Sequence, residues 1–201
     1  MITGASRGIG LALVKWFSAH YHKVWALSRN TTPITQLNLP NVTVNALDLT
    51  NEDGVVSWAQ NEAPDTIDAL INNAGKLVNK PFAETTQSDF EGVFKVNVFG
   101  LANLTRALLK KLQPTGHVVN ISSMGGIGGT SKFPGLTAYS SSKGAVSILT
   151  ELLAEEFKET GPAVNALALG AVQTEMLSDA FPGLEVPMTA AMMADYIAQF
   201  A

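Results

Sequence analysis

The chain has 201 residues, a length that suits one domain, and 46% of them are hydrophobic. Its net charge is −4, and its 13 lysines and arginines are scattered, which disfavours binding to nucleic acid or an anionic membrane. The absence of cysteine excludes disulfides, thiolate catalysis and zinc sites with cysteine ligands, and no metal site is expected. We find no signal-peptide pattern and no apolar run near the ~20 residues of a membrane span, so we expect a cytoplasmic protein.

Short apolar runs alternate with stretches of helical period along the whole chain. The runs are typical of strands buried on both faces and are Lys23–Ser28, Val42–Leu47, Ile67–Asn72, His117–Ser122 and Ala163–Ala168. This order predicts an α/β fold over residues 1–201, with a doubly wound parallel sheet and helices on both of its faces.

Apolar residues at helical spacing predict the helices between these strands. The first helix carries Ile9, Leu13, Trp16 and Phe17, and the second carries Phe90, Phe94, Asn97, Leu101, Leu104 and Leu108. Ser88 and Glu91 have capping-box spacing, and Pro114 follows two lysines, so we expect the second helix to start and stop there. A third helix is expected from about Leu136 to Lys158, and a last one from Ala190 to Phe200.

Glycines lead directly into the first helix. Gly4, Gly8 and Gly10 follow a strand-like opening in the segment Thr3–Gly10. Glycine lets the backbone approach a pyrophosphate, and the N–H groups at the start of the helix stabilise its charge. The segment therefore predicts a dinucleotide site, although an ordinary flexible turn has a similar composition.

Tyr139 and Lys143 are four residues apart at the start of the third helix and so share one helical face. A nearby ammonium group lowers the pKa of a phenol, which is ordinarily near 10, so the pair is suited to proton transfer. Tyrosine and lysine at this spacing are also common on solvated faces, and the pair alone does not establish chemistry.

Several motifs occur together and in order. They are TGxxxGxG at Thr3–Gly10, NNAG at Asn72–Gly75, a serine pair at the end of a strand, and YxxxK at Tyr139–Lys143. From Thr3 to about Met176 the chain resembles the short-chain dehydrogenase/reductase family. The resemblance implies a Rossmann-like fold and hydride transfer between a nicotinamide cofactor and a carbonyl or secondary alcohol substrate.

The resemblance also implies roles for the catalytic residues. Tyr139 would exchange a proton with the substrate oxygen, and Lys143 would lower the tyrosine pKa and hold the cofactor ribose. Ser123 would hydrogen-bond the substrate oxygen, with Ser122 as the alternative. Asn97 would hold a water that connects the lysine to solvent; a core asparagine with satisfied hydrogen bonds is the other interpretation.

The same resemblance implies a set of cofactor-binding residues. They are Gly4, Ser6, Arg7, Gly8, Ile9 and Gly10 in the glycine loop, Asp48 and Leu49 at the adenine, Asn73, Ala74 and Gly75 on the adenosine side, Val172 and Thr174 at the nicotinamide amide, and the pair Tyr139 and Lys143.

The end of the second strand indicates which cofactor is used. NAD users generally carry an acid there, whereas this strand is followed by Arg29, and no acid lies between Gly10 and Asp48. We therefore expect NADP rather than NAD, with Arg7 as a second contact to its 2′-phosphate. Each arginine could instead be a solvated surface residue, and Asp48 an ordinary helix cap.

The chain departs from the family at three places. Only Met1 and Ile2 precede the glycine loop, Leu169-Gly170 replaces the usual Pro-Gly, and no final strand follows the last helix. The chain is therefore either a trimmed member or an incomplete copy. The resemblance still implies a homodimer or homotetramer.

Two other functions compete with the oxidoreductase. A non-catalytic dinucleotide-binding sensor or scaffold would keep the fold. A serine hydrolase using Ser140 and Lys143 would need a G-x-S-x-G elbow around Ser140, and no such pattern accompanies that pair. The substrate pocket is expected from residues 124–137 and 175–188. The apolar side chains in these two segments suggest an apolar substrate. They are Phe133, Met176, Leu177, Phe181 and Leu184.

Overall fold

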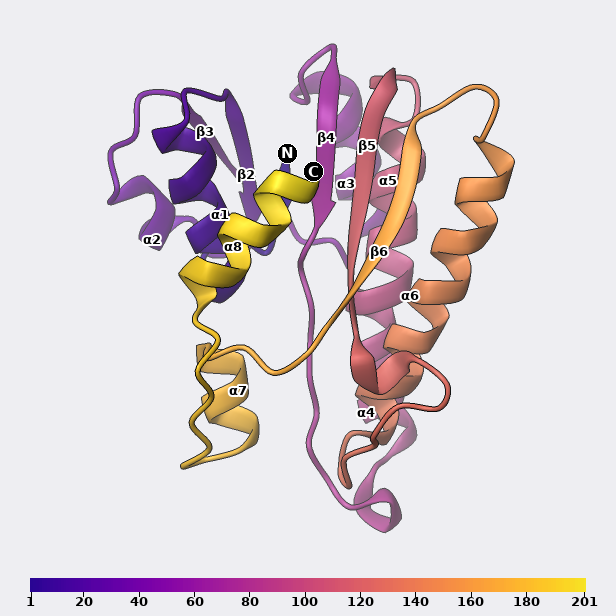
Figure 1. Cartoon of the computed structure of the whole chain (residues 1–201). Helices are drawn as coiled ribbons and strands as arrows, with labels where there is room; N and C mark the ends of the chain where they lie inside the picture. Colours follow the sequence, from indigo (N-terminus) through magenta and orange to yellow (C-terminus); the bar gives the residue numbers. More distant parts are fainter. The chain divides into compact units, whose positions relative to one another are not determined.

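The computed structural model describes all residues from Met1 to Ala201, which fall into two compact units (Figure 1). The first unit contains residues 1–48, 71–74 and 171–201, and the second contains residues 49–70 and 75–170. Strand β4 (Ile67–Asn72) contributes to both units.

The first unit places the glycine loop between a strand and a helix. Its strands are β1 (Ile2–Thr3), β2 (Val24–Ser28) and β3 (Val42–Ala46), and its helices are α1 (Gly8–Ala19), α2 (Thr32–Thr35), α7 (Glu175–Ala180) and α8 (Ala190–Phe200). Helix α1 packs on β1, β2 and α8. Leu13 and Val14 on this helix are both 0% exposed, whereas Ile9, Trp16 and Phe17 are half-buried.

The second unit contains the longest helix and the longest strand. Its elements are α3 (Glu52–Asn61), η1 (Phe82–Glu84), α4 (Gln87–Phe94), the π-helical η2 (Lys95–Gly100), α5 (Leu101–Leu108), β5 (Leu112–Ser123), η3 (Met124–Gly126), α6 (Thr137–Glu156) and β6 (Ala163–Leu169). Helix α6 packs on β5, β6 and α4, and α3 packs on α5.

The strands form a parallel sheet in the order β3-β2-β1-β4-β5-β6. In the register of the first unit, Ile2 of β1 lies opposite Ala26 on one side and Ile71 on the other. The predicted Rossmann-like α/β fold is therefore confirmed. No strand follows β6, and only an isolated bridge joins Gln173 to Thr189. None of the helices combines the length and the apolar character that crossing a membrane requires.

The predicted start of the second helix is wrong. The capping box forms between Thr86 and Asp89, because the threonine hydroxyl accepts from the Asp89 N–H while the aspartate accepts from the Thr86 N–H at 3.0 Å. Lys80 fixes the aspartate from outside the helix through an ion pair of 2.9 Å. This ion pair and the hydrogen bonds from Thr86 lower the pKa of Asp89 to about 2.

The predicted end of the second helix is also wrong. Helix α5 ends at Leu108 rather than at Pro114. The carbonyl of Lys111 already accepts a hydrogen bond from the Ile67 N–H, which draws this part of the chain into strand β5. Pro114 has no N–H to donate and lies before the ladder with β6, which begins at His117.

Candidate active site

A close glycine contact positions the end of β5 against helix α6 in the second unit. A Cβ on Gly126 would lie 2.6 Å from the Gly144 nitrogen and 2.6 Å from the Lys143 carbonyl carbon. These backbone atoms cannot move aside as a flexible side chain can, so only glycine permits the contact. The approach brings η3, which follows Ser123, onto the helix turn that carries Lys143.

Buried polar contacts hold the same strand and helix together. Asn120 of β5 donates to the Thr150 hydroxyl at 2.9 Å, and Ser122 donates to the Lys143 carbonyl at 2.9 Å. Ser122 also shares a hydrogen bond of 2.9 Å with Ser147. Because buried polar groups need such partners, the two hydrogen bonds of Ser122 fix the Lys143 turn of α6 on β5.

Tyr139 and Lys143 lie on one face of α6, as their spacing predicts. The Lys143 Nζ atom is 5.8 Å from the centre of the tyrosine ring, and it donates to the Ile121 carbonyl at 2.7 Å. Lys143 is 4% exposed, and burial lowers the pKa of its ammonium group to about 8. Burial also raises the pKa of the Tyr139 phenol, and a hydrogen bond with Ser123 opposes that rise. The net direction is opposite to the one expected from the lysine alone.

The two serines at the end of β5 have different surroundings. The Ser122 hydroxyl is 2% exposed and already occupied by Lys143 and Ser147. Ser123 is half-buried, caps η3 by accepting from the Gly125 N–H, and hydrogen-bonds with Tyr139. The geometry therefore favours Ser123 as the serine that meets a ligand together with the tyrosine.

Asn97 lies in the π-helical segment η2 and is 1% exposed. Its Oδ1 accepts from the Lys76 N–H at 2.7 Å, and its Nδ2 donates to the Lys76 carbonyl at 3.0 Å and to the Ser142 hydroxyl at 2.9 Å. Both amide hydrogens are thus used within the protein. The side chain itself matches the alternative of a satisfied core asparagine, and any role in holding water falls to another atom.

The glycine loop is shaped by the NNAG segment in the first unit. The Thr3 hydroxyl accepts from the N–H groups of Asn73 and Ala74, both at 3.0 Å, and Asn73 Nδ2 donates to the Thr3 carbonyl at 3.0 Å. Gly4 has φ +64°, and a Cβ on Gly10 would lie 2.2 Å from the Gly4 carbonyl oxygen. The loop thus has the tight path that lets a backbone approach a pyrophosphate.

The other residues predicted to bind a cofactor differ in exposure. Val172 and Leu49 are buried, and Thr174 caps α7 by accepting from the Leu177 N–H at 3.3 Å. Ser6, Ile9 and Gly75 are half-buried, and Arg29 and Asp48 are exposed. Asp48 does not cap α3, because that role belongs to Asn51.

Arg7 forms an ion pair that the sequence did not indicate. Its guanidinium lies 3.3 Å from the Asp179 carboxylate of α7, and both side chains are more than half exposed. An exposed pair of this kind is weak and is screened by salt, so the arginine stays available to another anion.

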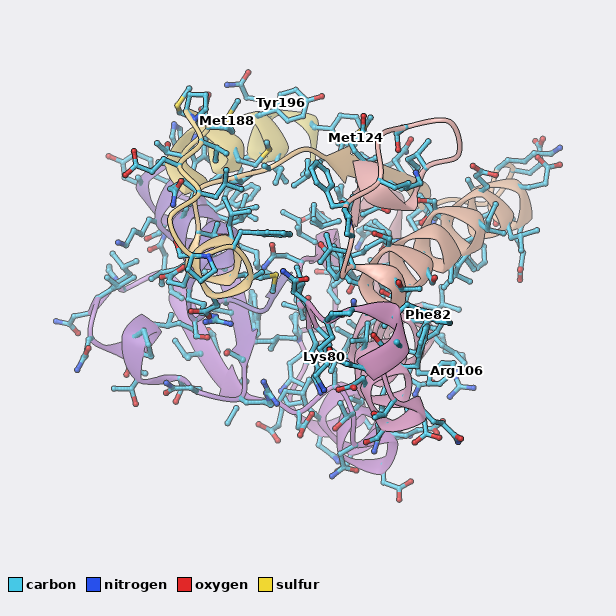
Figure 2. The ribbon with its side chains drawn as sticks, turned by 90° about the horizontal axis from the view of Figure 1, so that it is seen from below. Lys80, Phe82, Arg106, Met124, Met188 and Tyr196 are labelled. Carbon is cyan, nitrogen blue, oxygen red and sulfur yellow. The ribbon has the colours of Figure 1, made fainter.

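The apolar residues predicted to line a substrate pocket differ in exposure: Phe133 and Leu184 are exposed, whereas Met176, Leu177 and Phe181 are half-buried. Phe133 is 61% exposed, and in the second unit Met124 and Phe82 also present their side chains to solvent (Figure 2).

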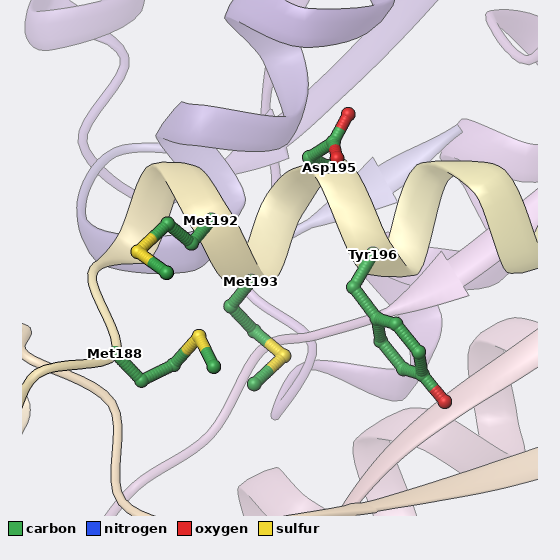
Figure 3. A pocket seen from close by; sticks show the side chains of 5 residues that line it. All are labelled: Met188, Met192, Met193, Asp195 and Tyr196. Carbon is green, nitrogen blue, oxygen red and sulfur yellow. The ribbon is translucent and has the colours of Figure 1, made fainter.

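Helix α8 and Met188 border a cavity of about 440 Å³ in the first unit. Figure 3 shows the side chains of the five residues that line it, which are Met188, Met192, Met193, Asp195 and Tyr196.

The chain matches the family model described as short chain dehydrogenase over residues 1–185. It belongs to the short-chain dehydrogenase family. The predicted family is therefore confirmed, and the short-chain dehydrogenase motifs lie where the fold brings β5 and α6 together and where the glycine loop meets α1.

Several curated proteins are moderately similar to this chain. Oxidoreductase BOA17 of Botryotinia fuckeliana (strain B05.10) is 32% identical over 182 residues, which cover 87% of this chain and 65% of the relative. Cyclopentanol dehydrogenase of Comamonas sp. (strain NCIMB 9872) is 36% identical over 135 residues, which cover 65% of this chain and 52% of the relative. Gluconate 5-dehydrogenase of Gluconobacter oxydans (strain 621H) is 31% identical over 186 residues, which cover 88% of this chain and 72% of the relative. The chain thus spans between half and three quarters of the length of these relatives.

Solved structures resemble the whole chain. A short-chain dehydrogenase from Streptomyces avermitilis gives a TM-score of 0.86 at 30% identity and covers 98% of this chain and 82% of its own. ElxO with NADP bound gives a TM-score of 0.83 at 28% identity and covers 100% of this chain and 89% of its own. 4-Hydroxyisoleucine dehydrogenase complexed with NADH gives a TM-score of 0.86 at 26% identity and covers 100% of this chain and 89% of its own.

Proposed function

We propose that the protein is an NADP(H)-dependent oxidoreductase that interconverts a carbonyl compound and a secondary alcohol. One observation carries the proposal: Ser123 hydrogen-bonds with Tyr139, while the Lys143 ammonium lies 5.8 Å from the same ring. A hydroxyl and a cation that both approach one phenol form a proton donor and acceptor site. The dinucleotide path of the glycine loop supports the choice of a nicotinamide cofactor.

In the reducing direction the cofactor supplies a hydride, and the protein supplies the proton. Burial raises the pKa of Tyr139, so the phenol holds its proton until a substrate oxygen becomes negative. The Ser123 hydroxyl donates a hydrogen bond to that oxygen, and the nearby Lys143 charge stabilises the phenolate that remains. In the oxidising direction the same groups act in reverse order.

Arg29 and Arg7 support NADP as the cofactor. Arg29 is exposed after β2, in the position where NAD users carry an acid. Arg7 at the start of α1 adds a second guanidinium that can bind a phosphate with paired donors. Among the similar structures, ElxO holds NADP and 4-hydroxyisoleucine dehydrogenase holds NADH.

The first test replaces Tyr139 with phenylalanine. Tyr139→Phe removes the transferable proton and keeps the ring, so turnover should be lost while NADPH binding stays within about twofold. The measurements are a fluorescence titration with NADPH and NADH, and the change in cofactor absorbance with a panel of ketones, aldehydes and alcohols. Cyclopentanol and gluconate belong in the panel because two relatives are named for them.

Full turnover in Tyr139→Phe would refute the assignment of the proton donor. If the unmodified chain binds NADPH but reduces no compound of the panel, the alternative of a dinucleotide-binding sensor or scaffold is the better description. Tighter binding of NADH than of NADPH would contradict the proposed cofactor.

A further inference from the structure

Ser142 lies one residue before Lys143 and is 0% exposed. Its hydroxyl accepts a hydrogen bond from Asn97 Nδ2 at 2.9 Å and donates one to the Tyr139 carbonyl at 2.6 Å. One hydroxyl therefore joins the π-helical segment η2 to the first turn of α6.

The asparagine on the other side of this link is itself fixed. Asn97 binds both the N–H and the carbonyl of Lys76, at 2.7 and 3.0 Å. A continuous series of hydrogen bonds thus runs from the backbone after β4, through Asn97 and Ser142, to the backbone of Tyr139. All of these residues belong to the second unit.

The start of α6 needs such an anchor. The residue before the helix, Leu136, provides no side-chain cap, and Tyr139 is only the third helical residue. The first turn of a helix has unpaired N–H groups and frays when no cap binds them. The hydrogen bond from Ser142 is made to the Tyr139 carbonyl, and it restrains this turn because Ser142 is itself tied through Asn97 to the backbone of Lys76.

We propose that Ser142 is a positioning residue, which holds the Tyr139 turn in place through Asn97. This inference rests on the oxidoreductase function proposed above. Ser142 does not contact the reacting atoms; its contribution is to keep the phenol aligned with Ser123 and Lys143.

The same helix supplies a matched control. Thr150 is also buried, accepts from the amide of Asn120 at 2.9 Å and donates to the Val146 carbonyl at 2.7 Å. Ser142→Ala and Thr150→Val therefore each remove one hydroxyl with the same kinds of partner. Only the first of these hydroxyls binds the turn that carries Tyr139.

We expect both variants to unfold at a lower temperature, because each removes a buried hydroxyl that accepts a hydrogen bond from an asparagine amide. Ser142→Ala should also lower kcat about tenfold or more with little change in KM, whereas Thr150→Val should keep kcat within about twofold. In a double-mutant cycle, Asn97→Ala combined with Ser142→Ala should lower kcat no further than the more severe single change.

A readout that needs no turnover separates this proposal from the proposed function. The chain has three tyrosines, so NMR with isotope-labelled tyrosine resolves the Tyr139 ring signals, assigned with Tyr139→Phe. Ser142→Ala should shift those signals and Thr150→Val should not. Equal losses of kcat in the two variants, or unchanged Tyr139 signals, would overturn the proposal. If Ser142→Ala shifts the Tyr139 signals although the unmodified chain catalyses no reaction, the proposed oxidoreductase function is refuted and the positioning role of Ser142 is supported.

Discussion

Lys143 combines a charged group with an almost completely buried position. It is 4% exposed, and the partner of its Nζ atom is a backbone carbonyl rather than a carboxylate. Burial disfavours the charged form, which lowers the pKa of the ammonium to about 8. The folded chain thus keeps a cation next to the tyrosine at a cost in stability, as is common at functional sites.

This cost depends on pH in a defined direction. Between the folded pKa of about 8 and the ordinary value of 10.5, the unfolded chain binds the lysine proton and the folded chain does not. The free energy of unfolding should therefore rise with pH through this window by up to roughly 3 kcal/mol, relative to Lys143→Met. Urea unfolding of both chains across the window measures the difference.

Below pH 8 the cost of burying the charge is fully present, and above 10.5 it is relieved. A difference between the two chains that does not change with pH would show that folding does not disfavour the ammonium. Lys143→Met should also lose turnover at every pH, because it cannot stabilise the phenolate.

At the scale of elements, the contact of η3 with α6 determines where Ser123 lies. A methyl group on Gly126 would be 2.6 Å from backbone atoms of Lys143 and Gly144, so Gly126→Ala must separate the two elements. We expect this variant to lose about 1–3 kcal/mol of stability and to lower kcat more than it weakens cofactor binding. Urea unfolding and initial rates measure the two effects.

Gly128→Ala is the control for this prediction. It lies two residues farther on, and its added Cβ would have no neighbour within 4 Å. Its stability should stay within about 0.5 kcal/mol of the unmodified chain. Equal behaviour of the two variants would show that η3 is not held by close packing.

Elements with a strong local pattern are predicted well from the sequence. The strand Ile67–Asn72 and the helix Ala190–Phe200 coincide with β4 and α8. The second helix is predicted poorly because distant residues set its details. Lys80 selects the capping aspartate, and the π-helical segment accompanies contacts of Asn97 with residues 21 and 45 positions away.

In the candidate site, too, features set by local spacing are predicted from the sequence, and features set by distant residues are not. The spacing of Tyr139 and Lys143 predicts that they share a face, and the family motif selects Ser123. Ser142 and Asp179 are absent from the sequence-based predictions. Their partners, Asn97 and Arg7, lie 45 and 172 residues away, and a periodic pattern within one helix gives no information about such partners.

At the scale of the molecule, cofactor binding should stabilise the folded chain. NADPH at about 100 times its Kd should add about 2.7 kcal/mol to the free energy of unfolding, and NADH at the same concentration should add less. Arg29→Gln should remove this preference, because it deletes the proposed contact to the 2′-phosphate. Thermal unfolding with each cofactor measures the preference.

Arg106→Gln is the matched control, since Arg106 is also exposed but pairs with Glu52 in the second unit (Figure 2). It should retain the full preference for NADPH. An equal effect of the two arginine variants would indicate a general loss of positive charge rather than a specific phosphate contact.

The packing of α1 on α8 also affects how the chain folds during synthesis. Residues 8–19 are synthesised well before residues 190–200, the helix on which they pack. Domains made on the ribosome generally fold in the order of synthesis, but here one side of α1 cannot be covered until α8 has been made. The apolar surface that α1 presents to α8 therefore stays exposed to solvent on the nascent chain over most of the synthesis of residues 20–200.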